Sequence, residues 1–301
     1  MNLDLFGNEI VKDELLRDKF IEPPFSVLDT KSGNWQKRKR LWINKGLKSE
    51  IGRAAKAIIG GTDIYRKISE KEDYNNRDNY VSVFDPALCE VLYHWFCPDG
   101  GKILDPCAGG SVRGIVAHYL GYKYSGVDIR QEQVDSNREQ ALNILPINNQ
   151  PQWYVGDSRE FLHIGDNRHD PFYNKEETFD FVFTCPPYAN LETYSTLEGD
   201  ISNMNYEDFL KGYELIIDNS CALLKKGCYA CFVVGEVRGD DGNYLGLVPD
   251  TINAFKKSGM KYYNEAILLN PVASASMRAN GNMKSQKLVK IHQNILVFKK
   301  H

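Results

Sequence analysis

Residues 179–188 read Phe-Asp-Phe-Val-Phe-Thr-Cys-Pro-Pro-Tyr. The first five of these residues alternate and are rich in aromatic side chains, which predicts a buried β-strand. Pro186 and Pro187 cannot continue the ladder, because proline lacks the N–H donor and has a fixed φ. We therefore expect the chain to leave the sheet at Cys185 and to present Tyr188 at the carboxyl end of the strand. In open α/β sheets, ligands bind at that edge.

From about Phe84 onward, the sequence alternates between strand-like and helix-like segments. The expected strands cover residues 102–104, 122–127, 153–155, 179–183, 228–234, 262–269 and 290–298. The expected helices cover 86–96, 105–120 after a loop, 131–145, 206–224 and 249–258. This alternation predicts a Rossmann-like α/β fold, with a mostly parallel seven-stranded sheet, helices on both faces and right-handed crossovers. The last two strands are consecutive, so we expect them to add an antiparallel edge.

The 301 residues are enough for one large α/β domain with an extension. We expect a tail and linker over residues 1–30, a basic helical extension over 31–80 and a single domain over 81–301. No run approaches the about 18 consecutive apolar residues of a membrane span. Residues 1–6 also lack the basic and apolar regions of a signal peptide. These features predict a cytoplasmic protein without a membrane segment.

The seven cysteines have no regular spacing, so we expect free thiols. Cys228 and Cys231 have the spacing of metal ligands, but no second pair completes a set of four. Because these two residues lie within an expected buried strand, we predict no metal site.

The net charge of −3 conceals two strongly basic segments. Residues 31–56 contain nine Lys and Arg against one acid, and residues 272–301 contain six and no acid. Separate basic segments on an acidic body suggest a polyanion with a defined binding face, although solvated surface charge would give the same pattern. The candidate nucleic-acid contacts are Lys37, Arg38, Lys39, Arg40, Arg278 and Lys284.

A second informative stretch, residues 103–114, combines a strand, a glycine-rich turn and a helix start. Such a turn lets the backbone approach a ligand closely, and the helix start offers free N–H groups. The dinucleotide pattern G-x-G-x-x-G and the Walker lysine are both absent. Asp128 and Asp157 follow the next two expected strands, where the first could accept bonds from two ribose hydroxyls and the second a bond from an adenine amino group. Either acid could instead cap a helix.

The Cys-Pro-Pro-Tyr segment resembles the (Asp/Asn/Ser)-Pro-Pro-aromatic signature of methyltransferases that modify exocyclic amino groups of DNA bases. The loop from Asp105 to Gly110 is similar to that of S-adenosylmethionine binders, and residues 84–299 as a whole resemble phage- or prophage-type DNA methyltransferases. The resemblance implies a class I methyltransferase fold, S-adenosyl-L-methionine as cofactor and double-stranded DNA as partner. No recognition domain lies between the two motifs, so the basic N-terminal helices are the candidate for DNA contact.

The resemblance also implies roles for particular residues. Cys185 and the Pro186 carbonyl would accept the N–H bonds of the target amine, with Pro187 fixing the turn and Tyr188 stacking on a base rotated out of the duplex. The residues implied in cofactor binding are Phe84, Asp105, Pro106, Cys107, Ala108, Gly109, Gly110, Asp128, Ile129, Asp157 and Ser158.

Cys185 departs from the signature, which has Asp, Asn or Ser at this position. Because cysteine has the shape of serine, the segment is most similar to Thr-Ser-Pro-Pro-Tyr of cytosine-N4 enzymes, and we favour cytosine N4 over adenine N6. The thiol also permits nucleophilic attack on cytosine and methylation at carbon 5. Two further alternatives are an RNA base methyltransferase and a non-catalytic nucleic-acid-binding module.

Residues 2–6, Asn-Leu-Asp-Leu-Phe, resemble the peptide by which bacterial proteins dock on the replication sliding clamp. The segment from Leu3 to Phe6 is therefore a candidate clamp contact, with a simple terminal tail as the alternative.

Overall fold

The computed structural model describes residues 15–47, 84–147, 150–162, 172, 178–188, 195, 197–272 and 275–301. These residues contain an eight-stranded sheet in the order β1-β7-β8-β6-β5-β2-β3-β4. The strands are β1 Val27–Asp29, β2 Lys102–Asp105, β3 Lys123–Asp128, β4 Gln152–Val155, β5 Phe179–Thr184, β6 Leu224–Val234, β7 Lys261–Leu269 and β8 His292–Lys299. All seven strands predicted from the sequence are present, with bounds shifted by a few residues.

Neighbouring strands run parallel except around β8, which is antiparallel to both β6 and β7. This confirms the predicted Rossmann-like α/β class with a mostly parallel sheet. From β2, the order continues to β3 and β4 on one side and to β5 and β6 on the other. The connections therefore diverge between β2 and β5, and a crevice opens at the carboxyl ends of these two strands.

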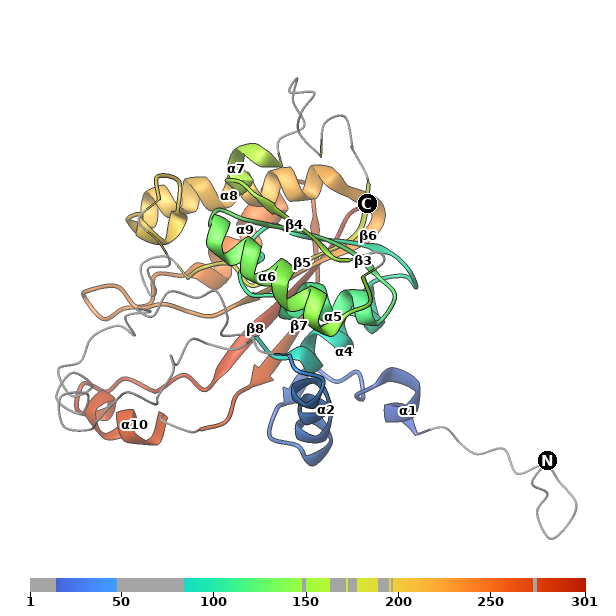
Figure 1. The fold of residues 1–301 in the computed structure, drawn as a ribbon. Coiled ribbons are helices and arrows are strands. Elements are labelled where there is room, and N and C mark those ends of the chain that lie inside the picture. The colour runs from blue at the N-terminus through green and yellow to red at the C-terminus, as the bar shows by residue number, and fades with distance from the viewer. Residues whose placement is uncertain are drawn as a thin grey trace, which may run out of the picture.

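Helices pack on both faces of the sheet. They are α1 Leu16–Phe20, α2 Gly33–Asn44, α4 Pro86–Phe96, α5 Val112–Tyr119, α6 Gln131–Ile144, α7 Ser158–Phe161, α8 Tyr206–Leu223, α9 Leu247–Lys257 and α10 Ala275–Lys284, with a 3₁₀ turn at Ile201–Asn203. Figure 1 shows α8 and α9 on one side of the strands and α4 and α5 on the other. Among the described residues, no helix has the length and apolar character needed to cross a membrane.

Strand β5 illustrates why the sequence specifies two cores. Phe181 and Phe183 pack into the cluster under α4, α5 and α6, whereas Val182, which lies between them, packs into the cluster under α8 and α9. Alternate side chains of a strand point to opposite faces. A strand that is apolar on both faces is therefore buried on both, as the aromatic run predicts.

The N-terminal segment differs from the prediction of a tail and linker. Residues 27–29 form β1, which pairs in parallel with β7 and adds an eighth strand to the seven predicted. The Trp95 indole N–H on α4 donates to the carbonyl of Phe20, the last residue of α1 (2.8 Å). This bond holds the end of α1 against α4. Strand β1 covers the edge of β7 that would otherwise expose unpaired backbone groups.

Helix α2 is anchored on α4 through two acidic side chains. The Trp35 indole N–H (3.1 Å) and the Lys39 ammonium (3.3 Å) both reach Asp85. Glu90 accepts bonds from Arg38 (2.6 Å) and from the Trp42 indole (3.2 Å). The helix predicted at the start of the basic extension is therefore real and packed against the domain, whereas residues 48–83 of that extension lie outside the described part of the chain.

We expect Trp35→Ala to lower the free energy of unfolding by about 3–5 kcal/mol, because it empties a fully buried site and removes the bond to Asp85. Leu41→Ala on the exposed face of the same helix (55% exposed) is the matched control and should change stability by less than about 0.5 kcal/mol. Urea titration followed by tryptophan fluorescence measures both. Equal, small effects would show that α2 is not part of the folded core.

Candidate active site

A cavity of about 220 Å³ lies at the carboxyl ends of β2, β3, β4 and β5. It contains the whole Cys-Pro-Pro-Tyr segment, Cys185 to Tyr188, and most of the predicted cofactor residues. Those lining it are Phe84, Pro106, Cys107, Gly109, Asp128, Ile129, Asp157 and Ser158. Other residues that line the cavity were not predicted from the sequence, among them Arg113, Arg130, Gly199, Asp200, Ile201 and Gln293.

Asp105, Ala108 and Gly110 do not line the cavity, contrary to the expectation of cofactor contact. The Asp105 side chain is fully buried, and each carboxylate oxygen already accepts two hydrogen bonds. One oxygen receives the Thr184 hydroxyl (2.7 Å) and the Cys107 amide (3.3 Å). The other receives Arg113 Nε (2.5 Å) and the Tyr124 hydroxyl (2.7 Å). Asp105 therefore stabilises the loop after β2 through these hydrogen bonds and does not line the cavity itself.

Arg113, on the first turn of α5, brings a guanidinium group to the cavity wall. Its Nη2 donates to the carbonyls of Cys107 (2.7 Å) and Ala108 (2.8 Å), and its Cζ lies 4.6 Å from the centre of the Phe84 ring. Burial opposes the positive charge, but the Asp105 carboxylate together with the other polar groups around the guanidinium outweighs burial and raises the pKa of Arg113. A permanently charged cation is therefore built into this wall.

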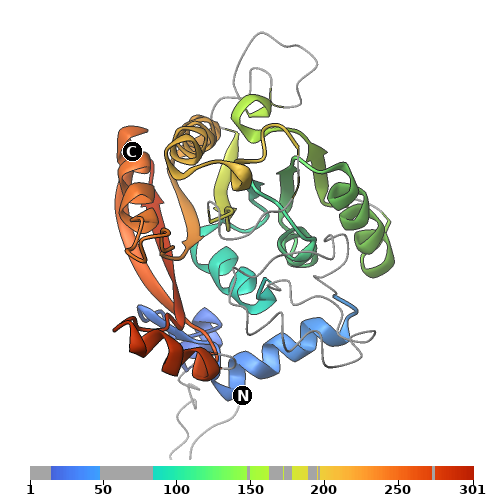
Figure 2. The same cartoon turned by 90° about the vertical axis from the view of Figure 1, so that its left-hand side faces the viewer.

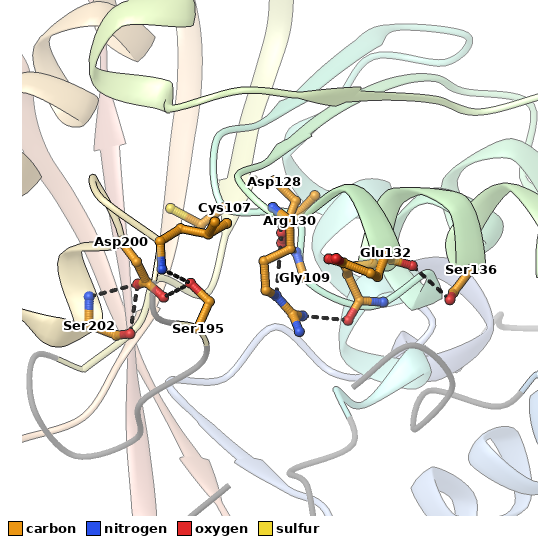
Figure 3. Close-up of polar contacts among 12 residues, drawn as sticks. Cys107, Gly109, Asp128, Arg130, Glu132, Ser136, Ser195, Asp200 and Ser202 are labelled. Atoms are coloured by element: carbon orange, nitrogen blue, oxygen red, sulfur yellow. Dashed lines mark hydrogen bonds and ion pairs between the residues drawn. The ribbon is translucent and has the colours of Figure 1, made fainter. Parts of the chain in front are cut away.

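Asp128 also lines the cavity, at the end of β3. One of its oxygens accepts the Gly109 amide and the other the Arg130 amide, both at 2.9 Å (Figure 3). Gly109 can turn its N–H toward Asp128 because its φ is +50°, a region that favours glycine. Burial raises the pKa of Asp128. A carboxylate has about four lone-pair sites, so two remain to accept bonds from a ligand.

Asp157 both caps a helix and lines the cavity. It accepts the Arg159 amide at the start of α7 (3.0 Å), and the Arg159 guanidinium holds both of its oxygens. Gly199, which has a φ of +97°, passes so close that a Cβ there would lie 2.7 Å from Asp157 Oδ2. Next to it, Asp200 binds the hydroxyls of Ser195 (2.7 Å) and Ser202 (2.6 Å), as Figure 3 shows.

The Tyr188 hydroxyl is held by three groups. Gln293 Nε2 on β8 donates to it (2.6 Å), it donates to the Val233 carbonyl on β6 (3.3 Å), and Cys185 Sγ lies 3.5 Å away. The position of the tyrosine ring is therefore fixed by the two strands β6 and β8. Gln293 lies 105 residues from Tyr188 in sequence, and no motif marks it.

The thiol of Cys107 also faces the cavity. Burial, and then the Asp105 carboxylate, raise the pKa of Cys107 well above its ordinary value, so the group is a neutral thiol. Within the described ranges, no group of three or more His, Cys, Asp or Glu side chains is arranged to hold a metal ion.

The predicted nucleic-acid contacts fall into two groups. Arg38 and Lys39 are ion-paired with Glu90 and Asp85, whereas Lys37 and Arg40 are exposed on α2. Arg278 and Lys284 are exposed on α10, in the connection between β7 and β8 that leads directly to Gln293. Figures 1 and 2 both show α10 and α2 in the lower part of the molecule. The clamp-like segment from Leu3 to Phe6 and the polar stretch 189–194 lie outside the described residues.

Comparisons with known proteins find similarity only to solved structures of the same fold. No protein-family model and no curated protein sequence matches the chain. Among solved structures, a proposed DNA modification methylase from Thermus thermophilus is 23% identical with a TM-score of 0.34; the match covers 48% of this chain and only 50% of that protein. A TehB-like S-adenosylmethionine-dependent methyltransferase from Corynebacterium glutamicum is 16% identical, with coverages of 79% and 95% and a TM-score of 0.41.

A third structure, magnesium protoporphyrin IX methyltransferase from Synechocystis with bound S-adenosylmethionine, is 14% identical, with coverages of 79% and 90% and a TM-score of 0.45. At these identities and TM-scores, the likenesses carry no information on the substrate.

The raised pKa of Asp128 predicts a pH-dependent stability. Between about pH 4 and that raised pKa, the folded protein keeps a proton that the unfolded chain has released, so the free energy of unfolding falls as the pH rises. Asp128→Asn cannot titrate. We therefore expect the stability of this variant, relative to the wild type, to increase with pH across the window in urea titrations. Asp135→Asn on the exposed face of α6 (58% exposed side chain) controls for the loss of one acid, and identical slopes in the two variants would contradict the prediction.

Proposed function

We propose that this protein transfers a methyl group from S-adenosyl-L-methionine to an exocyclic amino group of a base in DNA, with cytosine N4 favoured over adenine N6. The observation that carries the proposal is the meeting of Cys185, Pro186, Pro187 and Tyr188 with two strand-end acids in one cavity. The first group resembles the amino-methyltransferase signature, and the acids resemble the adenosine contacts of that family.

The residues of the cavity fit this cofactor. Asp128 retains acceptor sites for ribose hydroxyls after binding its two backbone donors. The backbone of Gly109 and Gly156 lines the same cavity, and Asp157 borders it. When bound, the cofactor supplies an electrophilic methyl group on a sulfonium. The side chains named here would bind and orient it.

The reaction joins the amine nitrogen to the methyl carbon as the carbon–sulfur bond breaks, which turns the sulfonium into a thioether. The methylated amine then gives up one proton to water. The nitrogen lone pair of an exocyclic amine is delocalised into the ring, so acceptors on its N–H groups are needed to draw it toward tetrahedral geometry. The Pro186 carbonyl and Cys185 Sγ would supply these acceptors. Tyr188, fixed by Gln293 and Val233, would stack on the flipped base, which pre-organises the site.

Double-stranded DNA would approach from the face that carries α10 and α2. Arg278 and Lys284 on α10, with Lys37 and Arg40 on α2, are exposed cations suited to phosphates. Arg38 and Lys39 have a structural role instead, because their charges are paired on α4.

The proposal is tested by incubating the protein with methyl-labelled S-adenosylmethionine and either genomic DNA or total RNA, followed by nucleoside mass spectrometry. We expect N4-methylcytosine in DNA. N6-methyladenine in DNA would keep the reaction class and change the base, whereas a signal only in RNA, or in 5-methylcytosine, would overturn DNA amino transfer. Cofactor binding without turnover on any polymer would favour a binding module.

Cys185→Ser is the matched variant for this experiment. Serine offers an oxygen acceptor of similar shape, so amino transfer should continue at a rate of the same order. Carbon-5 chemistry needs the thiolate to form a covalent bond with the base, and loss of such a nucleophile typically costs about 10⁴-fold or more. Abolished turnover in Cys185→Ser, with the fold intact by circular dichroism, would therefore contradict amino transfer.

We expect the double variant Arg278→Ala/Lys284→Ala to bind duplex DNA more weakly and with a shallower salt dependence. Each lost phosphate contact should reduce the slope of log K against log salt by about 0.9. Lys102→Ala/Lys123→Ala is the control, because it removes two exposed lysines at the first residues of β2 and β3, at the end of the strands opposite to α10. Equal losses in the two double variants, measured by fluorescence anisotropy, would show that α10 has no special role.

A further inference from the structure

We infer that Arg113 is an anion subsite that binds the carboxylate at the amino-acid end of the cofactor. The inference rests on the proposed function. It assigns the recognition of the cofactor carboxylate to a residue outside the loop from Asp105 to Gly110 that resembles S-adenosylmethionine binders. Asp105, one of the residues implied in cofactor binding, does not make a contact at this end of the cofactor, since both of its oxygens already accept hydrogen bonds inside the protein.

Arg113 has more N–H donors than its bonds within the described protein use. A guanidinium has five N–H donors. The single donor of Nε goes to Asp105, and the two donors of Nη2 go to the carbonyls of Cys107 and Ala108. Within the described part of the chain, no hydrogen bond uses Nη1, and this atom is not among the fully buried side-chain atoms that lack a partner. Nη1 is therefore open, and the opening available to it is the cavity that Arg113 lines.

The group is also held rigidly. Three hydrogen bonds and the Phe84 ring at 4.6 Å define the plane of the guanidinium, and its side chain is only 5% exposed. An arginine fixed in this way loses little conformational entropy when it binds a carboxylate. Water competes weakly at a site of this burial, which strengthens a charge-assisted bond.

The position of Arg113 matches the amino-acid end of the cofactor. Asp128, whose remaining acceptor sites suit adenosine, lies at the end of β3, and Asp157 borders the cavity after β4, whereas Arg113 is joined through Asp105 to Thr184, the residue before Cys185. The transferred methyl group has to lie near Cys185. The amino-acid arm of the cofactor branches from the same sulfur, so its carboxylate falls within the Arg113 side of the cavity.

Arg130 is the competing cation and provides the matched control. It lines the same cavity with a side chain that is 10% exposed, but it pairs with Asp128 (3.8 Å) and donates to Gln133 (2.7 Å). It therefore belongs to the adenosine side. If Arg130 held the carboxylate, the cofactor would have to lie in the opposite direction.

The test compares two ligands that differ by one carboxylate: S-adenosylhomocysteine and its decarboxylated analogue, 5′-(3-aminopropylthio)-5′-deoxyadenosine. Isothermal titration calorimetry with the wild type should show a preference of about 10- to 100-fold for the carboxylate-bearing ligand. Arg113→Gln should reduce this preference to about threefold or less, while Arg130→Gln should leave it intact. If Arg113 only supports the loop, both ligands weaken equally in Arg113→Gln and the preference persists, which overturns the inference.

Arg113→Gln leaves the buried Asp105 without its counter-ion, so the variant could fail to fold. The double variant Asp105→Asn/Arg113→Gln removes both charges with little change in shape and should show the same loss of preference. The wild type alone also decides the matter, because equal affinity for the two ligands overturns the inference whatever the variants do. Failure of S-adenosylhomocysteine to bind the wild type would instead refute the proposed cofactor.

Discussion

The ion pair between Asp105 and Arg113 is the interaction on which the arrangement of the cavity depends. It joins the end of β2 to the first turn of α5, and Asp105 also binds Tyr124 of β3 and Thr184 of β5. Four elements therefore meet at one fully buried carboxylate. Removing one partner from such a pair typically costs about 3–5 kcal/mol, because the other charge remains buried. The loop after β2, which lines the cavity, is held in place by the same network.

Much of the fold could be predicted because its signals are local. The aromatic alternation of β5 ends at two prolines, and the structure ends that strand at Thr184. Helix α4 has the predicted bounds, Pro86–Phe96, because Asp85 caps it and Pro86 occupies its first position. The candidate site could also be predicted from the sequence, because the residues that follow the strands of a parallel sheet all lie at the carboxyl ends of those strands. All four residues of the Cys-Pro-Pro-Tyr segment reach the cavity for that reason.

What could not be predicted depends on contacts between distant segments. Strand β1 has only three residues and no pattern, and it forms because β7 offers it an edge. Gln293 reaches Tyr188 only because β8 inserts antiparallel beside β6. From the sequence, Arg38 and Lys39 were predicted to be available for nucleic acid. The acids that pair with them, Glu90 and Asp85, lie about 50 residues later in the sequence, so the local pattern does not show the pairing. Asp105 was placed at the correct strand end, yet a sequence does not show that internal donors occupy every oxygen.

The antiparallel placement of β8 has an evolutionary consequence. The connection from Leu269 to His292 leaves the sheet and returns to it at one edge, and it carries α10 between these two points. Insertions, deletions or exchanges within this excursion would leave the strand pairing and both cores unchanged, since surface connections tolerate such changes far better than packed elements do. The scaffold thus separates the packed frame of the cavity from a connection that is free to vary, and selection can diversify the second without rebuilding the first.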